Sequence, residues 1–337
     1  MRQTQRSKFS PLRRSLVAAV AAIGLTAGLS PIAQASTDYP NKPVRLIVPY
    51  APGGATDVIG RVVAQHLSTA LGQQFVVENR AGAGGSIGAG QVAKAEADGY
   101  TVMLGAFTSH TINAALMPET VPFDINNSFE YVSIVGRVPL VFVTHPSVEA
   151  KNLSDLIALA KAKPGALSFA SAGNGSPQHM ALELFQRQTG TEVLHVPYKG
   201  SGPALTDLVG GQINAMIDTV PAAQSQIQAG NLRALGTTTE ERVPTLPNVP
   251  TAAEAGLPDF HISSMFALAA PAGTPEPVVR KLNDALKEIL NKQEVKDSLL
   301  AQGALATYTT PEDASKAIIE EYNKWVNLIK EANIQVQ

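Results

Sequence analysis

Short apolar strands alternate with amphipathic helices through most of this chain, and this alternation limits the possible folds more than any other feature. Residues 56–71 show the helical part: Ile59, Val63 and Leu67 recur at helical spacing, and Gly72 ends the run. Strands interleaved with helices are typical of parallel sheets covered by helices on both faces. We therefore predict an α/β fold that starts with strands at 44–48, 75–77 and 100–104, one or two more at 134–143, and helices at 56–71 and 88–97.

The same alternation starts again after residue 150, and two such runs predict two lobes. The tail differs, because its two amphipathic helices have apolar stripes that need a sheet to cover. The second run contains predicted helices at 156–161, 177–188 and 203–209 and strands at 167–170, 192–196 and 215–217, and the tail helices span 277–291 and 311–331.

The first 35 residues have the pattern of a secretory signal peptide. A basic stretch precedes the apolar run 16–29, and Ala33-Gln34-Ala35 is a small-x-small cleavage signal, so we expect cleavage after Ala35 and a periplasmic protein. The export route stays open between the general and the twin-arginine pathways, since Arg13-Arg14 has poorly fitting neighbours. The apolar run is too short for a membrane span, and no later stretch is long and apolar enough.

The charge and the cysteine count exclude several classes of function. Removing the five basic residues of the leader leaves 21 basic against 28 acidic residues, a net charge of −7. An acidic surface argues against nucleic acid and anionic membranes as partners. The chain has no cysteine, which excludes disulfides, thiolate metal sites and a cysteine nucleophile. We expect no cofactor and no metal.

Four strand-to-helix turns are candidates for ligand binding. In open α/β sheets, ligands bind beyond the carboxyl ends of the strands, where helix starts offer backbone N–H groups and a positive dipole to an anion. We expect the N–H groups of Gly53, Gly54 and Ser176 to hold the anion, with helix starts at Ser176-Pro177 and at Gly202-Pro203. The four turns are PYAPGGAT (49–56), GAFTSHT (105–111), SAGNGSP (171–177) and PYKGSGP (197–203).

Individual polar residues near these turns allow more than one interpretation. His110 and His179 could donate to a ligand, although capping or packing is an equal alternative. Lys199 could be a counter-charge, although a solvated lysine is the default. Asp57 would repel an anion at its own helix start, so we expect it to brace the turn through backbone N–H groups.

Two further sequence motifs indicate other possible functions. Gly84 to Gly88 fits G-x-S-x-G, with Asp218 and His261 following in hydrolase order, so a secreted serine hydrolase using Ser86 is the alternative function. A G-x-G-x-x-A match begins at Gly88, but the next strand offers no acid for a ribose. The chain has no G-K-[ST] motif, and its six histidines are scattered.

Several long stretches resemble the tripartite tricarboxylate transporter receptors, or Bug family, of periplasmic binding proteins. The resemblance covers essentially the whole mature chain, with Asn214 in place of a frequent acid. The stretches that carry it are YPNKPVRLIVPYAPGGATDVIGR (39–61), VVENRAGAGGSIGA (76–89), ADGYTVMLG (97–105), SAGNGSPQHMALELF (171–185), HVPYKGSGPALTDLVGGQI (195–213) and LPNVPTAAEAGLPDF (246–260).

The resemblance implies a type II periplasmic binding protein fold. Two lobes, each with a mainly parallel sheet flanked by helices, would enclose a cleft, with two crossing strands at 138–143 and 263–268 as the hinge and the tail helices returning to the first lobe. After the signal peptide (1–35), we expect lobe 1 at 36–137 plus 265–337 and lobe 2 at 138–264.

The resemblance also implies a function and a set of ligand contacts, much of it through backbone groups and water. We expect a monomeric binding protein that captures a small carboxylate by lobe closure and delivers it to an ion-driven membrane carrier, unless it is an orphan receptor without one. The ligand would be a dicarboxylate, a tricarboxylate, an acidic amino acid or an aromatic acid. The expected contacts are Tyr50, Ala51, Pro52, Gly53, Gly54, Ala55, Thr56, Asp57, Thr108, Ser109, Ser171, Gly173, Asn174, Gly175, Ser176, His179, Tyr198, Lys199, Gly200 and Asp218.

Overall fold

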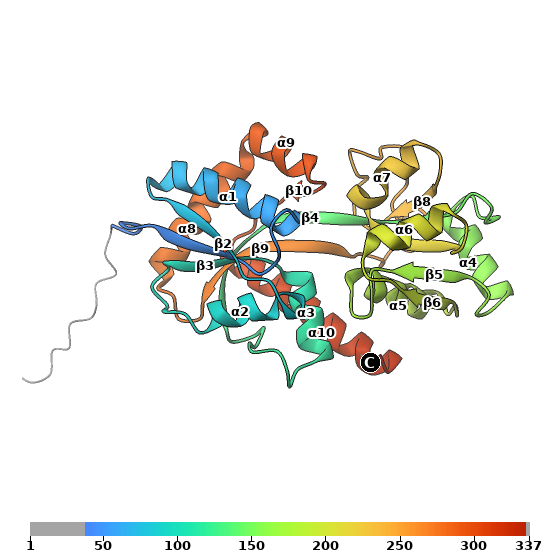
Figure 1. The fold of residues 1–337 in the computed structure, drawn as a ribbon, viewed down its shortest axis with the longest axis horizontal. Helices are drawn as coiled ribbons and strands as arrows, with labels where there is room; N and C mark the ends of the chain where they lie inside the picture. Colours follow the sequence, from blue (N-terminus) through green and yellow to red (C-terminus); the bar gives the residue numbers. More distant parts are fainter. Residues whose placement is uncertain (1–37, 335–337) are drawn as a thin grey trace, which may run out of the picture. The chain divides into compact units, whose positions relative to one another are not determined.

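A computed structural model describes residues 38–334 of the chain (Figure 1). The expected signal peptide and its cleavage after Ala35 lie outside the described residues. Every described helix and strand belongs to one compact unit, Pro40–Gln337. Among the described helices, none combines the length and the apolar character that crossing a bilayer requires.

The strands form one continuous path in the order β2-β1-β3-β9-β4-β7-β5-β6, with β8 and β10 each paired to β4. The β1–β2, β1–β3, β5–β6 and β5–β7 pairs are parallel, which confirms the predicted α/β fold. We call sheet 1 the part made of β1 (Val44–Val48), β2 (Phe75–Asn79), β3 (Thr101–Ala106), β9 (Ser263–Pro271), β10 (Leu305–Ala306) and the first part of β4 (Phe129–Thr144). Sheet 2 contains β5 (Ser168–Ser171), β6 (Leu194–Pro197), β7 (Ala215–Thr219), β8 (Arg233–Thr237) and the last part of β4.

The strand β4 connects the two sheets. Its residues up to Pro139 pair with β9, and from Leu140 onward it pairs with β7 and β8. β9 begins one residue after Ile262, whose N–H donates to Thr238 O beyond the end of β8. Two strands therefore run between the sheets, side by side and antiparallel (Figure 1). The sequence predicted one or two strands at 134–143; β4 is a single strand of 16 residues because its side chains are buried on both faces almost throughout.

Helices cover both sheets, and several differ from the prediction. α2 is earlier and shorter than the predicted 88–97. α6 begins at Ser201, so the predicted start at Gly202-Pro203 is late by two residues, and α7, α9, β8 and β10 were not predicted. Beside sheet 1 lie α1 (Ala55–Leu71), α2 (Ser86–Ala93), α3 (Phe107–Leu116), α8 (Glu276–Asn291), α9 (Gln293–Ala301) and α10 (Pro311–Ala332); beside sheet 2 lie α4 (Leu153–Ala162), α5 (Pro177–Thr189), α6 (Ser201–Val209) and α7 (Val220–Gln228) (Figure 1).

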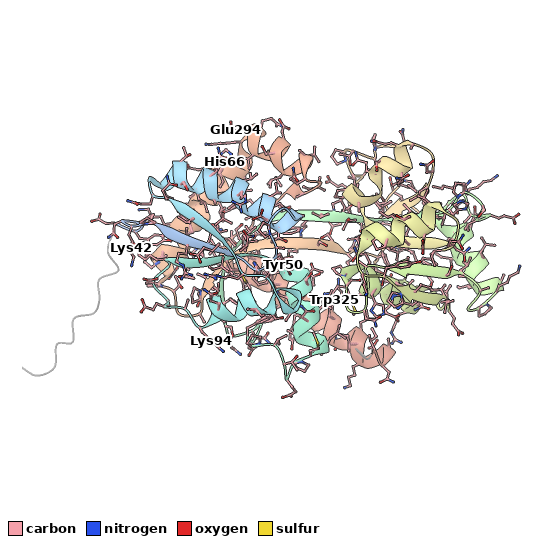
Figure 2. The ribbon with its side chains drawn as sticks, in the orientation of Figure 1. Lys42, Tyr50, His66, Lys94, Glu294 and Trp325 are labelled. Atoms are coloured by element: carbon pink, nitrogen blue, oxygen red, sulfur yellow. The ribbon has the colours of Figure 1, made fainter. Side chains whose placement is uncertain are left out.

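The C-terminal helix α10 belongs to the cores of both sheets. Ala314 and Ile318 pack in the apolar cluster of sheet 1. Trp325, labelled in Figure 2, and Leu328 pack instead in a cluster that contains Phe169 of sheet 2. The tail helices were expected to return to the first lobe. That holds for α8, which packs on β4 and α1, but α10 also continues onto sheet 2.

Candidate functional site

A cavity of about 330 Å³ lies where the two sheets meet. The crossing strands contribute Val138, Ser264 and Phe266, and the ends of β1, β3 and β7 lead into the cavity. None of the lining side chains carries a formal charge at neutral pH. The lining residues are Tyr50, Ala55, Thr56, Ala106, Ser109, Val138, Thr219, Pro221, Ser264, Phe266 and Gln302.

Three helix N-termini meet at this cavity. α1 contributes its first residues Ala55 and Thr56, α3 contributes Ser109, and α7 contributes its N-cap Thr219. None of these three helices has a side-chain cap on its first turn. First-turn N–H groups without a cap, together with the helix dipoles, favour an anion. The cavity can therefore hold a negative group without a cationic side chain.

A larger cavity, of about 810 Å³, lies on the other face of the crossing strands. Because side chains alternate along a strand, Val138 and Ser264 face the smaller cavity while their neighbours Arg137 and Ser263 face the larger one. The larger cavity is the weaker candidate for an anion, because its carboxylates outnumber its cations. The cations are Arg137 and Lys324, and the carboxylates are those of Glu240, Glu241, Asp259, Glu320 and Glu321.

Asp57 braces the turn that leads into α1, as its position predicted. Its Oδ2 accepts from Gly53 N–H at 2.9 Å and from Arg61 Nε at 3.0 Å, and its Oδ1 accepts from Asn79 Nδ2 at 2.9 Å. Burial opposes ionisation, but these hydrogen bonds lower the pKa of Asp57 to about 2. The Gly53 N–H thus donates to Asp57 in this structure, and its role as an anion donor stays a prediction.

The other residues of this turn differ in whether they line the cavity. Tyr50 lines it, and burial raises the pKa of its phenol to about 12. Ala51, Pro52 and Gly54 are exposed and do not line the cavity.

The residues of α3 divide between the cavity and the core. Ser109 lines the cavity, but Thr108 is fully buried and its hydroxyl lies 3.0 Å from Ser263 O and 3.1 Å from Glu321 Oε1. The side chain of Thr108 is thus committed to these contacts, and Thr108 does not line the cavity. His110 is fully buried against the rings of Tyr50 and Phe107, and burial lowers its pKa to about 4. Of the two roles left open for His110, the geometry favours packing.

The geometry does not support a hydrolase. Ser86 is buried at the start of α2, and its hydroxyl has no hydrogen-bond partner among the described residues. Asp218 bonds to Gln178 and Ser201, and His261 lines the larger cavity, so the triad suggested by the sequence is not assembled. Within residues 38–334 no group of three or more His, Asp or Glu side chains is placed to hold a metal ion.

The SAGNGSP turn is held by hydrogen bonds of its own side chains and of two histidines outside it, His179 and His195. Ser176 caps α5 by accepting from His179 N–H at 3.2 Å, as predicted, but its own N–H donates to Gly173 O. Gly175 N–H donates to His179 Nδ1 at 3.1 Å, and the Ser171 hydroxyl lies 2.7 Å from His195 Nε2. The Ser176 N–H is therefore engaged within the turn in this structure, and its role as an anion donor stays a prediction.

This turn also lies apart from the 330 Å³ cavity. Asn174 and His179 line a separate cavity of about 380 Å³ together with Glu183, His195 and residues 332–334 at the end of α10. The ring of His179 stacks on that of His195 with centroids 4.2 Å apart. Burial, followed by the neighbouring His179, lowers the pKa of His195 to about 4.

Asp218 joins three helix starts beside sheet 2. Its Oδ1 accepts from Gln178 Nε2 at 2.9 Å on α5, from Ser201 Oγ at 2.8 Å on α6 and from Thr219 N at 2.7 Å before α7. Burial raises the pKa of this fully buried carboxyl. Asp218 thus positions Thr219, which lines the cavity, and does not line it itself.

The other residues of the PYKGSGP turn do not reach the cavity. Tyr198 donates its hydroxyl to Asp207 at 2.7 Å, Lys199 is exposed, and Gly200 is the N-cap of α6. The structure thus brings Tyr50, Ala55, Thr56 and Ser109 together at the cavity and places the remaining predicted side chains around it or elsewhere.

Sequence reasoning missed most of the cavity wall. The segment from Thr219, the last residue of β7, to Pro221 had a usable signal, namely a proline in the first turn of a helix after a short strand. Val138, Ser264 and Phe266 belong to strands whose facing side cannot be chosen without the sheet order. Gln302 follows α9 and gave no local signal. Ala106, the last residue of β3, was assigned to a turn.

Comparisons with known proteins agree with one another. The sequence model of the family described as "Tripartite tricarboxylate transporter family receptor" matches residues 59–334. Protein BugT of Bordetella pertussis is 42% identical over 323 residues, which cover 96% of this chain and 98% of BugT. A solved structure described as a periplasmic transporter is 41% identical with a TM-score of 0.74, covering 89% of this chain and all of the other. The R. palustris protein Rpa4515, solved with adipate, is 36% identical with a TM-score of 0.72, covering 88% and 99%.

Proposed function

The chain belongs to the tripartite tricarboxylate transporter receptor family, and from this premise we propose that it binds a small carboxylate in the periplasm and delivers it to a membrane carrier. The observation that carries the proposal is the cavity at three uncapped helix N-termini, which offers backbone donors and no charged side chain. A receptor of this kind binds its solute and releases it unchanged.

The cavity wall narrows the class of carboxylate. Between its polar groups lie the apolar side chains of Ala55, Ala106, Val138, Pro221 and Phe266. A hydroxyl placed against these groups would lose its hydrogen bonds to water, which costs free energy. An aliphatic or aromatic acid fits this wall better than a hydroxylated acid of equal charge, and the adipate in Rpa4515 is of the aliphatic kind.

Esterification of the ligand should abolish binding. Helix dipoles and backbone N–H groups act on the negative charge of the carboxylate, so neutral diesters of the acids that bind should show no heat in titration calorimetry and no thermal shift. Lys199→Ala should change affinity less than twofold, because Lys199 is exposed and does not line the cavity. A diester bound as tightly as its free acid would overturn the proposed recognition.

We propose two lobes, 36–137 plus 265–337 and 138–264, that close on the ligand by bending the crossing strands. The cavity supports this because Tyr50 and Ser109 come from sheet 1 elements while Thr219 and Pro221 come from sheet 2 elements. A ligand that contacts both groups stabilises the closed form to the extent that it binds that form better.

Small-angle scattering should therefore show a smaller radius of gyration with a bound carboxylate than without one. The same sample titrated with a non-binding diester provides the control. Tight binding with an unchanged radius of gyration would contradict the closure, while leaving carboxylate recognition intact.

A further inference from the structure

The C-terminal helix α10 connects the two groups of ligand turns expected from the sequence. It is one continuous helix of 22 residues, about 33 Å long. Near its middle, Glu321 Oε1 lies 3.1 Å from the hydroxyl of Thr108, which precedes the cavity residue Ser109 on α3. The same hydroxyl accepts from Met265 N–H at 3.0 Å, so this contact also includes the crossing strand β9.

The far end of α10 lies against sheet 2 elements. Trp325 and Leu328 pack in the cluster that contains Phe169 and Phe185. Glu331 Oε2 pairs with Arg187 Nη2 of α5 at 2.7 Å. Residues 332–334 line the small cavity with Asn174 of the SAGNGSP turn and with His179, whose Nδ1 accepts from Gly175 N–H in that turn.

Because α10 is stiff and contacts elements of both sheets, it cannot keep both contacts if the two sheets rotate relative to each other about β4 and β9. The contact near Glu321 is partly buried at the wall of the larger cavity, and the preceding part of the helix is anchored by the buried residues Ala314 and Ile318. The contact near Glu331 ends in an ion pair whose side chains are both about half exposed, and such pairs contribute little stability. Trp325 and Leu328 share their buried cluster with Ile112 of α3 as well as with sheet 2, so the last turn of α10, beyond Leu328, is the part that yields.

We propose that α10 is a positioning element that stays with sheet 1 through Glu321 and shifts at its last turn against α5 when a ligand binds, so that it couples the start of α3, at Thr108 and Ser109, to the SAGNGSP turn. Glu321 and Glu331 act through the backbone they position, without touching the ligand. This inference rests on the proposed function, and it adds a mechanical link between the two sides of the site.

A reducible tether tests the shift directly. The chain has no cysteine, so Arg187→Cys with Glu331→Cys gives a unique thiol pair for a cleavable bismaleimide. The tethered protein should bind adipate, or the tightest acid of a carboxylate panel, at least tenfold more weakly, and its radius of gyration should not decrease. Reduction of the tether should restore both. The matched control is Arg280→Cys with Glu312→Cys. In the parent protein Arg280 Nη2 lies 2.7 Å from Glu312 Oε1 and joins α8 to the start of α10 beside sheet 1, so a tether there should change neither affinity nor compaction.

A second measurement needs no ligand. Glu321→Ala should speed amide hydrogen exchange at residues 171–177, which Glu321 does not contact, while Glu320→Ala, at the neighbouring exposed position, should not. Unchanged exchange at 171–177 in Glu321→Ala overturns the coupling. The coupling is also overturned if the protein tethered at 187 and 331 binds and compacts as the parent does. An equal loss of affinity and compaction in the control tethered at 280 and 312 overturns it as well. A parent protein that binds no carboxylate contradicts the proposed function instead, and the exchange result still decides the coupling.

Discussion

Replacing Asp57 by alanine should destabilise the protein by about 1.5–3 kcal/mol and weaken carboxylate binding about tenfold. The buried carboxylate accepts hydrogen bonds from Gly53, Arg61 and Asn79, and charge-assisted bonds of this kind contribute in that range. Without Asp57 the Gly53 N–H loses its acceptor, and the turn that places the first residues of α1 at the cavity loosens. Urea unfolding and titration calorimetry measure the two effects.

The contribution of Asp57 should depend on pH in a defined direction. Its folded pKa of about 2 is below the value of ~3.9 for an unfolded chain, so its stabilisation is present above about pH 4 and is lost as pH falls through about 2. The difference in stability between the parent and Asp57→Ala should therefore shrink over that window. Asp297→Ala, at an exposed carboxylate on α9, is the control and should be nearly neutral. A constant difference from pH 7 to pH 2 would show that the ionised carboxylate is not the cause.

Gly175→Val should remove ligand-induced compaction and weaken binding at least tenfold. Gly175 has φ +72°, a conformation that costs an L-residue roughly 1–2 kcal/mol, and a Cβ there would lie 3.0 Å from Leu116 Cδ1 on α3. From the sequence, one would expect this side chain to intrude on the ligand; the structure shows that it meets the facing helix instead. Valine would therefore push the SAGNGSP turn away from α3.

Two comparisons separate the clash from the backbone strain. Gly190→Val, at the end of the same helix, has φ +61° and no atom within 4 Å of the added Cβ, so it should lower stability yet leave binding and compaction intact. Adding Leu116→Ala to Gly175→Val should restore part of the compaction. Scattering and calorimetry that find Gly175→Val equal to Gly190→Val would refute the interlobe contact.

The fold could be predicted further than the site. The strand–helix alternation and the stop at Gly72 depend on local periodicity, and both agree with the structure. α7 was missed although Val220, Ala223 and Ile227 recur at helical spacing and Pro221 lies in its first turn. The length of β4 was missed because a strand buried on both faces has no alternation to read.

Within the site, local chemistry was predictable and long-range placement was not. The brace at Asp57 and the cap at Ser176 depend on residues three or four positions apart. Thr108 was misjudged because the acceptors of its hydroxyl, Ser263 and Glu321, lie more than 150 residues away in sequence. Gln302 was missed for a similar reason, because only the assembled fold brings the end of α9 beside α7.

The position of β9 in sheet 1 sets an order for folding. β9 separates β3 from β4 in that sheet, yet residues 145–262 come between β4 and β9 in the chain. Closing so long a loop is entropically costly and slow. Sheet 2 draws its strands from the single stretch 140–237, so these strands can pair before later residues are made, although Trp325 and Leu328 of α10 complete its core afterwards. The half of the site that is encoded first is therefore completed last, after β9, α8 and α10 have been made.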